Sequence, residues 1–370
     1  MNLRMLAQNV RRLRNAKRLS QSALADSAGL SLAAIKSLEL AKREPRMSTM
    51  QAIAKALNVK IQELFQPVRE LHTVRFRSAK RMQNRENVLA EVARKLDDFN
   101  FLEESLNEKR PFLLSVVRDQ CSREHVVKAA ALCRKKLGLK PDEPIYDICG
   151  LLERAGVKVF QITVASDSFF GLSVGEEDGG PAVAVNVWER ISVERRIFSA
   201  AHELGHLMLH PDAYDIAKVA ENDEEEGEAN YFAGHFLMPN KGFRKEWNEA
   251  AGLHFVDRVF KVKSIFRVSY KAILSRLLEE EVVDSSIWRK FNIAYRERFN
   301  RKLPFKEEPM GIDSREPFGM QRFNFCEDRF QRLTREAVEK DKISLSRGAE
   351  MLRIDVEQMQ DLLQNWEVIL

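Results

Sequence analysis

Cysteine is scarce in this sequence, and its spacing provides no paired motif. The four cysteines lie at positions 121, 133, 149 and 326, and none of them forms a C-x-x-C pair. We interpret them as reduced, mostly buried thiols, which are typical of a cytoplasmic protein.

Long apolar runs are missing as well. No stretch approaches the about 18 apolar residues of a membrane helix, and Met1–Arg4 leads into a charged segment rather than a signal-peptide core. We therefore expect a cytoplasmic chain with no membrane partner. The net charge of +5 is too small to indicate a nucleic-acid partner by itself. Whether the chain binds nucleic acid therefore has to be judged from how the charges are distributed along the sequence.

The first 65 residues have the pattern of several short helices. Apolar residues recur at helical intervals from Leu6 onward, Ser20 and Ser31 are suited to begin helices, and Gly29 is suited to end one. Two more helices after Pro45 complete a predicted five-helix unit. Two short helices joined through a glycine turn are typical of a helix-turn-helix.

This stretch resembles the XRE/Cro-type helix-turn-helix family of phage repressors along its full length. The resemblance implies that the second helix of the pair enters the major groove of double-stranded DNA. A monomer that reads one half-site would bind weakly, so a homodimer is expected. By position, residues of this pair would contact base edges (Ser31, Leu32, Ala33 and Ser37) or phosphates (Gln21, Lys36, Lys42 and Arg43).

The base-reading positions carry no Arg, Asn or Gln that could form a bidentate bond to a base, so weak sequence discrimination is expected. The alternative is a small helical module for protein contacts. The basic first helix, with five Lys or Arg residues between Arg11 and Arg18, favours DNA.

The stretch Ala200–His210 contains the pattern H-E-x-x-H at His202, Glu203 and His206. On a helix, residues four apart lie on one face, so the two imidazoles would point the same way and could bind Zn²⁺. Glu203 would then reach a water at the metal and act as the general base of peptide hydrolysis. An apolar stripe in the same stretch predicts a helix packed in a core, which favours a metal site over two surface histidines.

A zinc site of this type needs a third protein ligand, and an acidic segment downstream offers two candidates. Glu226 and Asn230 are four residues apart, so Glu226 could bind the metal while Asn230 holds a ligand by a hydrogen bond. Glu228 is the alternative ligand. We expect His210 to end the helix that carries His202 and His206, and His235 to pack or to form hydrogen bonds. Three tyrosines are candidates to stabilise the oxyanion of the transition state, namely Tyr214, Tyr231 and Tyr270.

Alternating segments before the histidines predict strands at residues 157–162, 169–174 and 182–187, and a fourth is predicted near Val74. We expect a small antiparallel sheet with residues 182–187 near its edge, where an extended peptide could pair.

The motifs HELGHLMLH and EGEANYFAGHFLMP, with RRIFSA before them, resemble the ImmA/IrrE family of metallopeptidases over about residues 120–280. The resemblance implies a zincin-like domain in which His202, His206 and Glu226 bind zinc and Glu203 is the base. It also implies a protein substrate, typically a transcriptional repressor whose cleavage switches on stress or mobile-element genes. The alternative is a transcriptional regulator whose zinc domain is a sensor without turnover.

We therefore expect a mainly α-helical chain with an α+β peptidase domain. The predicted parts are a helix-turn-helix domain, a helical linker, the metallopeptidase domain and a helical C-terminal region, at residues 1–66, 67–120, 121–282 and 283–370. The last region is expected to serve packing or protein interaction.

Overall fold

The computed structural model describes residues 3–17, 19–65, 71–76, 85–166, 168–211, 223–303 and 316–367. The chain divides into two compact units, Met1–Leu71 with Lys80–Lys95, and His72–Ala79 with Leu96–Leu370. The chain is mainly helical, as predicted. No helix among the described residues is both long enough and apolar enough to span a membrane.

The first unit contains the predicted helix-turn-helix, formed by α2 (Gln21–Ala28) and α3 (Leu32–Glu39). Ser20 and Ser31 begin these helices, accepting hydrogen bonds from the backbone N–H groups of Ala23 and Ala34. Gly29 ends α2 with a φ of 64°, a conformation that suits glycine.

Three more elements of this unit surround the same buried apolar core, which includes Leu6, Leu24 and Ile35. They are α1 (Leu3–Ala16), α4 (Met47–Leu57) and η1 (Ile61–Leu64). The predicted fifth helix is a four-residue 3₁₀ turn and not an α-helix, in line with the preference of short helical pieces for this form.

The second unit is built around a four-stranded sheet with the order β1-β3-β4-β2. Its strands are β1 (Val74–Phe76), β2 (Lys158–Ile162), β3 (Gly171–Val174) and β4 (Ala182–Asn186). β3 pairs antiparallel with both β1 and β4, whereas β2 and β4 are parallel.

Two predictions about this sheet were therefore wrong. The sheet is mixed and not antiparallel, and residues 182–186 form an inner strand and not an edge. Every residue of β4 is buried, because helices cover both faces and strands flank both edges. Side-chain alternation predicts a strand, but it does not determine the direction or order of the partners.

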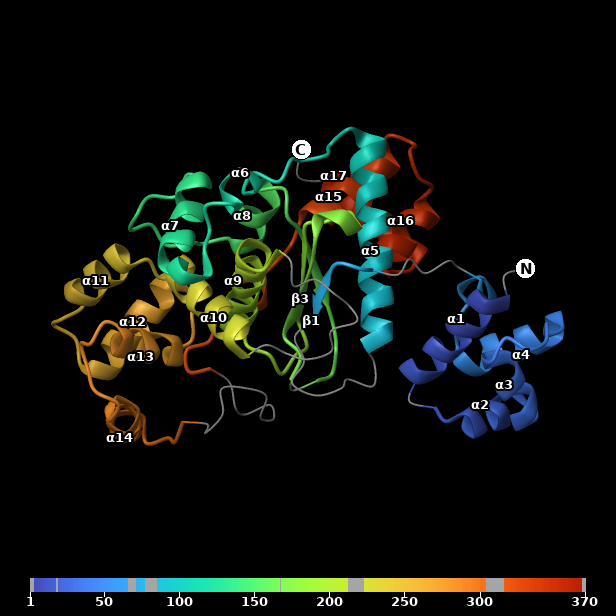
Figure 1. Ribbon diagram of the computed structural model, residues 1–370, viewed down its shortest axis with the longest axis horizontal. Coiled ribbons are helices and arrows are strands. Elements are labelled where there is room, and N and C mark those ends of the chain that lie inside the picture. Colours follow the sequence, from blue (N-terminus) through green and yellow to red (C-terminus); the bar gives the residue numbers. More distant parts are fainter. Residues whose placement is uncertain are drawn as a thin grey trace. The chain divides into compact units, whose positions relative to one another are not determined.

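Helices lie on both faces of the sheet (Figure 1). On one face, Val159 and Val183 belong to the same core cluster as Ile197 and Leu204 of α9 (Val193–Leu209). On the other face, the Phe160 ring lies 5.8 Å from that of Phe99, which belongs to α5 (Arg85–Leu106).

The C-terminal region packs on the same end of α5. Arg329, at the start of α15 (Arg329–Glu339), lies 2.6 Å from the Glu103 carboxylate, and both side chains are buried. Arg347 of α16 (Leu345–Leu352) pairs with Asp98. These contacts support the expected packing role, and α17 (Val356–Glu367) completes the region.

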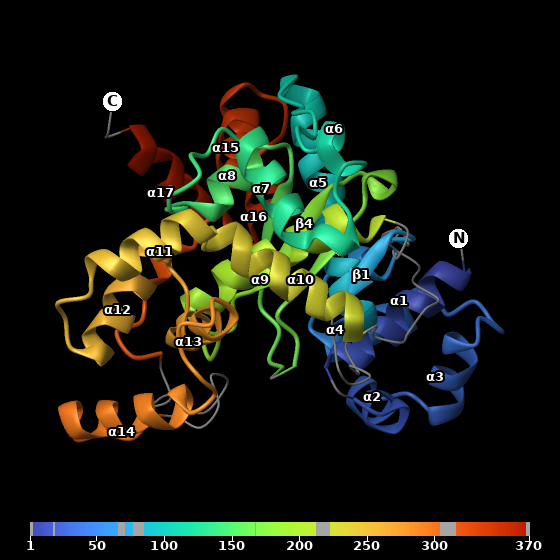
Figure 2. The same ribbon diagram turned by 60° about the vertical axis from the view of Figure 1, so that its left-hand side comes forward.

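Figure 2 shows α7 and α8 beside α9 and α10 (Asp223–Leu237). The remaining helical elements, these two included, belong to the second unit. In chain order they are α6 (Ser115–Arg118), η2 (Arg123–His125), α7 (Val126–Lys136), α8 (Ile148–Arg154), η3 (Glu176–Asp178), α11 (Asn240–Glu249), α12 (Phe255–Phe266), α13 (Tyr270–Glu279), α14 (Ile287–Phe299) and η5 (Arg322–Asn324).

Candidate metal centre

The helix that carries the H-E-x-x-H residues is fixed at its N-terminal end. Ser192 begins α9 by accepting a hydrogen bond from the Arg195 N–H at 3.2 Å. Arg196 donates to the carbonyls of Val187 and Trp188 at 3.1 and 3.2 Å, which joins α9 to the end of β4. As a result, the C-terminal half of α9, with the histidine pair, runs along one face of the sheet.

A close approach between α9 and α10 brings the acidic segment to the histidines. Gly205 lies on α9 between His202 and His206 and faces α10. A Cβ at Gly205 would be 3.1 Å from Phe232 Cδ1 and 3.3 Å from the Cα of Ala229, both on α10. Because glycine has no side chain, the two backbones can come this near. Glu226, one turn before Ala229, thereby reaches the histidine pair.

The side chains of His202, His206 and Glu226 converge. Their ligand atoms all lie within 4.8 Å of one another. The two Nε2 atoms are 2.9 Å apart, and the Glu226 carboxylate oxygens lie 3.3 Å from Nε2 of His202 and 3.2 Å from Nε2 of His206. Two donors bound to zinc at about 2.0–2.1 Å in a tetrahedral arrangement are roughly 3.4 Å apart, so this set fits a zinc ion with little adjustment.

Hydrogen bonds on the other ring nitrogens favour the form that binds a metal. His202 Nδ1 lies 3.0 Å from Asn230 Oδ1, so it can donate there and leave Nε2 with its lone pair. His206 Nδ1 lies 3.0 Å from Nδ1 of His210, and His210 Nε2 lies 2.7 Å from Glu228. When His206 Nδ1–H donates to His210 and His210 Nε2–H donates to Glu228, the Nε2 lone pair of His206 faces His202 and Glu226.

The electrostatics agree with this arrangement. Burial lowers the pKa of His206 well below its usual 6.5, which keeps the ring neutral. Burial alone would raise the pKa of Glu226, but hydrogen bonding with His202 and His206 outweighs it and lowers that pKa. An ionised carboxylate and imidazole nitrogens are ligands that zinc takes in proteins.

Glu203 is held from the sheet side. The Ser173 hydroxyl of β3 donates to Glu203 Oε2 at 2.8 Å, and both residues are buried. Gly171, two residues earlier, leaves room for the same carboxylate, since a Cβ there would lie 3.2 Å from Oε1. β3 therefore provides both a hydrogen-bond donor and the space for the carboxylate of Glu203, the predicted base.

The two predicted third ligands have different positions. Glu226 joins the histidine pair, whereas Glu228 contacts His210 and, at 2.8 Å, Arg123. His210 follows the last residue of α9, where the sequence placed it, and additionally contacts His206.

Sequence reasoning missed Ser173, Gly171 and Arg75, which ion-pairs with Glu225 and lies 3.6 Å from Glu226. All three lie on strands far from the motif in sequence, and no local pattern marks them.

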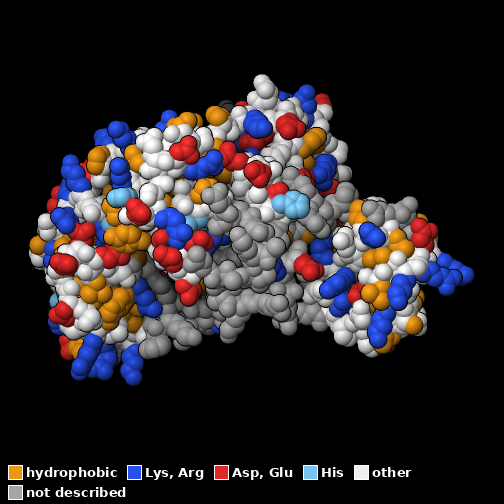
Figure 3. Space-filling model, viewed as in Figure 1, with side chains coloured by type: hydrophobic (Ala, Val, Ile, Leu, Met, Phe, Trp, Pro, Cys, Tyr) orange, Lys and Arg blue, Asp and Glu red, His pale blue; other side chains and the backbone are white. Residues whose placement is uncertain are grey.

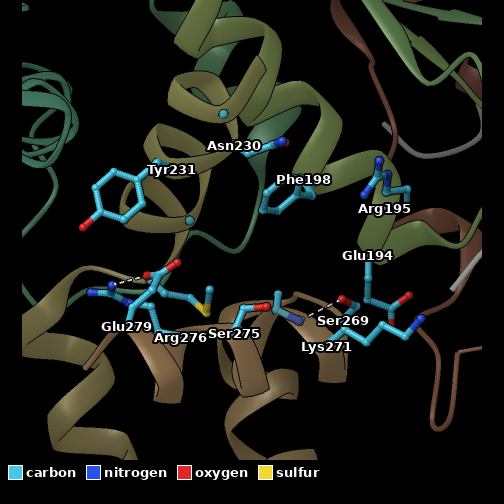
Figure 4. A pocket seen from close by; sticks show the side chains of 14 residues that line it. Glu194, Arg195, Phe198, Asn230, Tyr231, Ser269, Lys271, Ser275, Arg276 and Glu279 are labelled. Carbon is cyan, nitrogen blue, oxygen red and sulfur yellow. Dashed lines mark hydrogen bonds and ion pairs between the residues drawn. The ribbon is translucent and has the colours of Figure 1, made fainter. Parts of the chain in front are cut away.

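A cavity of about 350 Å³ lies beside the cluster, between α9, α10 and α13 (Figure 4). Asn230, the hydrogen-bond partner of His202, lines it together with Phe198 and Tyr231. The opposite wall is polar, and there Arg276 pairs with Glu279 at 2.7 Å.

The other predicted tyrosines and His235 have different surroundings. Tyr270 is buried and stacks on Phe291, while Tyr214 lies outside the described residues. His235 forms hydrogen bonds with Asn240 and Arg276, as the sequence led us to expect.

The predicted DNA-contacting residues are mostly at the surface of the first unit. Ser31, Leu32, Ala33, Lys36, Lys42 and Arg43 are exposed, and Ser37 is partly buried. Gln21 is also partly buried and donates to Glu39 at 2.7 Å. Lys and Arg side chains project from this unit, at the right of Figure 3, with exposed apolar side chains between them.

Comparison with known protein families gives two matches. Residues 152–278 match the IrrE N-terminal-like domain of the M78 peptidases, and residues 10–64 match a helix-turn-helix family. No curated protein matches the chain. The chain thus carries an N-terminal helix-turn-helix domain of the XRE type followed by an ImmA/IrrE-type domain of the M78 peptidase family.

Proposed function

We propose that this chain is a zinc-dependent endopeptidase that binds DNA and cleaves a partner protein. The observation that carries the proposal is the convergence of His202, His206 and Glu226, with both histidines oriented through their second nitrogens. These three residues would hold the ion, and Glu203 would act as the general base.

When bound, zinc polarises the scissile carbonyl and lowers the pKa of water at the site. Glu203 takes the proton from the attacking water and later transfers it to the leaving amide nitrogen. Ser173 keeps the Glu203 carboxylate in place through its hydroxyl. The cavity beside Asn230, with Phe198 and Tyr231 on its wall, would receive a side chain of the substrate.

The helix-turn-helix domain supports a substrate that is found on DNA. A repressor bound at an operator would be concentrated near an enzyme that binds the same region of DNA. We therefore propose a transcriptional repressor as the substrate, with one cut that relieves repression of stress or mobile-element genes. Ser31, Leu32, Ala33 and Ser37 would face bases, and Gln21, Lys36, Lys42 and Arg43 would contact phosphates.

The variant Glu203→Gln tests the catalytic role. It keeps the size and hydrogen bonding of the side chain but removes the base, so cleavage should fall by about 10²–10⁴-fold. Zinc affinity and DNA affinity should remain unchanged. Glu249→Gln, an exposed carboxylate on α11, is the matched control and should cleave normally.

The assay incubates zinc-loaded protein with candidate repressors and looks for one discrete cut by mass spectrometry. If Glu203→Gln cuts as fast as the parent, the base assignment is wrong. If it also regulates its target genes normally in cells, the zinc domain is a sensor and not a peptidase.

A further inference from the structure

The short strand β1 comes from a different part of the sequence than the other three strands of the sheet. β2, β3 and β4 all lie within the segment that matches the IrrE N-terminal-like domain, whereas Val74–Phe76 lies well before it in the chain. β3 is paired with β4 on its other side, so β1 occupies the one remaining edge of β3.

That edge belongs to the candidate active site. On β3, Ser173 donates a hydrogen bond to Glu203, and Gly171 leaves room for the same carboxylate. Arg75 lies directly opposite Ser173 in the antiparallel register, so the two side chains are on the same face of the sheet. The Arg75 guanidinium extends from there to Glu225 and to Glu226, the proposed metal ligand, at 3.6 Å. Any strand paired here therefore places a side chain at the metal cluster.

The Asp178 carboxylate binds the residues that lead into β1. Oδ2 of Asp178, on η3, accepts hydrogen bonds from the backbone N–H groups of His72 and Thr73 and from the Thr73 hydroxyl. The Thr73 carbonyl in turn accepts from the Gly175 N–H at 2.8 Å. Within the part of the chain that the structure describes, this strand pairs over three residues, and Asp178 and the Arg75 ion pairs add to its attachment.

We propose that the edge of β3 is the docking site for an extended peptide substrate, and that residues 72–76 of this chain occupy it as an internal competitor. The proposal rests on the peptidase function proposed above and adds its regulation. An extended substrate would add to the sheet through backbone hydrogen bonds at the same edge. Cleavage then requires that the substrate displace β1, so release of Asp178 or Arg75 activates the enzyme.

A binding measurement tests the docking site without depending on turnover. The probe is a fluorescein-labelled peptide with the sequence of residues 71–79, LHTVRFRSA, titrated with the zinc-loaded full chain carrying Glu203→Gln. Adding Asp178→Ala should strengthen its binding at least tenfold, because the internal strand is loosened. The control is Asp147→Ala, which removes another backbone-binding carboxylate, the one that accepts from the Gly150 N–H at the start of α8. Equal binding, or no binding, in all three proteins overturns the proposal.

A reversible lock tests the regulation. Val74 and Val174 are directly opposite in the register, so the double variant Val74→Cys with Val174→Cys can form a cross-strand disulfide when oxidised glutathione accepts the two electrons. Oxidation should lower the cleavage of a proteome-derived peptide library at least tenfold, and a phosphine reductant should restore it. Val74→Cys alone, treated in the same way, is the control.

The outcomes separate this proposal from the peptidase proposal. If the locked protein cuts as well as the reduced one, β1 does not block the site. If neither the parent nor the reduced variant cuts any peptide, the peptidase proposal fails, and the binding measurement still decides whether the edge of β3 accepts a strand.

Discussion

Replacing the two candidate third ligands by glutamine separates the roles that the structure gives them. Glu226→Gln removes the negative charge of one of the three candidate ligands, whereas Glu228→Gln changes a residue that contacts His210 and Arg123. Loss of a residue that orients a metal ligand typically costs 10–100-fold in metal affinity, about 1.4–2.7 kcal/mol. We expect Glu228→Gln to fall in that range, because its effect passes through His210 to His206. Glu226→Gln should exceed it, with a loss of more than about 100-fold.

The measurement is a competition titration of zinc between the protein and a chromogenic chelator at pH 7. Glu224→Gln is the matched control, since its side chain is 77% exposed on the same helix and should change zinc affinity little. A larger loss for Glu228→Gln than for Glu226→Gln would refute the ligand assignment. Equal affinity in all three variants would refute the metal site itself.

Four further expectations follow from the structure. Burial, followed by the charge of Arg276, lowers the pKa of His235 from 6.5 to about 4, so the unfolded chain binds the proton more readily between these values. The neutral His235 side chain therefore contributes up to about 3 kcal/mol to the free energy of unfolding above pH 6.5, and this contribution is lost by pH 4. Urea unfolding of His235→Gln should show a weaker pH dependence of stability between these two pH values. Gly205→Val should reduce stability by about 1–3 kcal/mol through overpacking between α9 and α10, and should weaken zinc binding in the same titration. Ser173→Ala removes the hydrogen bond to Glu203, so kcat should fall roughly tenfold or more, with zinc affinity unchanged. Lys42→Ala should reduce the salt dependence of DNA binding by about one phosphate contact, measured by fluorescence anisotropy across salt concentrations.

Local sequence alone determined the helices that carry the predicted functional residues. The 3.6-residue period of α9 places His202 and His206 on one face, and the N-cap serines and Gly29 mark where α2 and α3 begin and end. These signals involve residues at most four apart in the chain. They could therefore be recognised without knowing what each element packs against.

The tertiary structure decided what the helices and strands meet. The choice between Glu226 and Glu228 depends on how closely α10 approaches α9 at Gly205, a contact between separate elements. The order of the sheet likewise depends on pairing between separate strands, and the position of β1 beside Ser173 depends on pairing between strands about 100 residues apart. Such partners are selected by burial and backbone hydrogen bonding across the whole unit, and the alternation within one strand carries no information about which partner that will be.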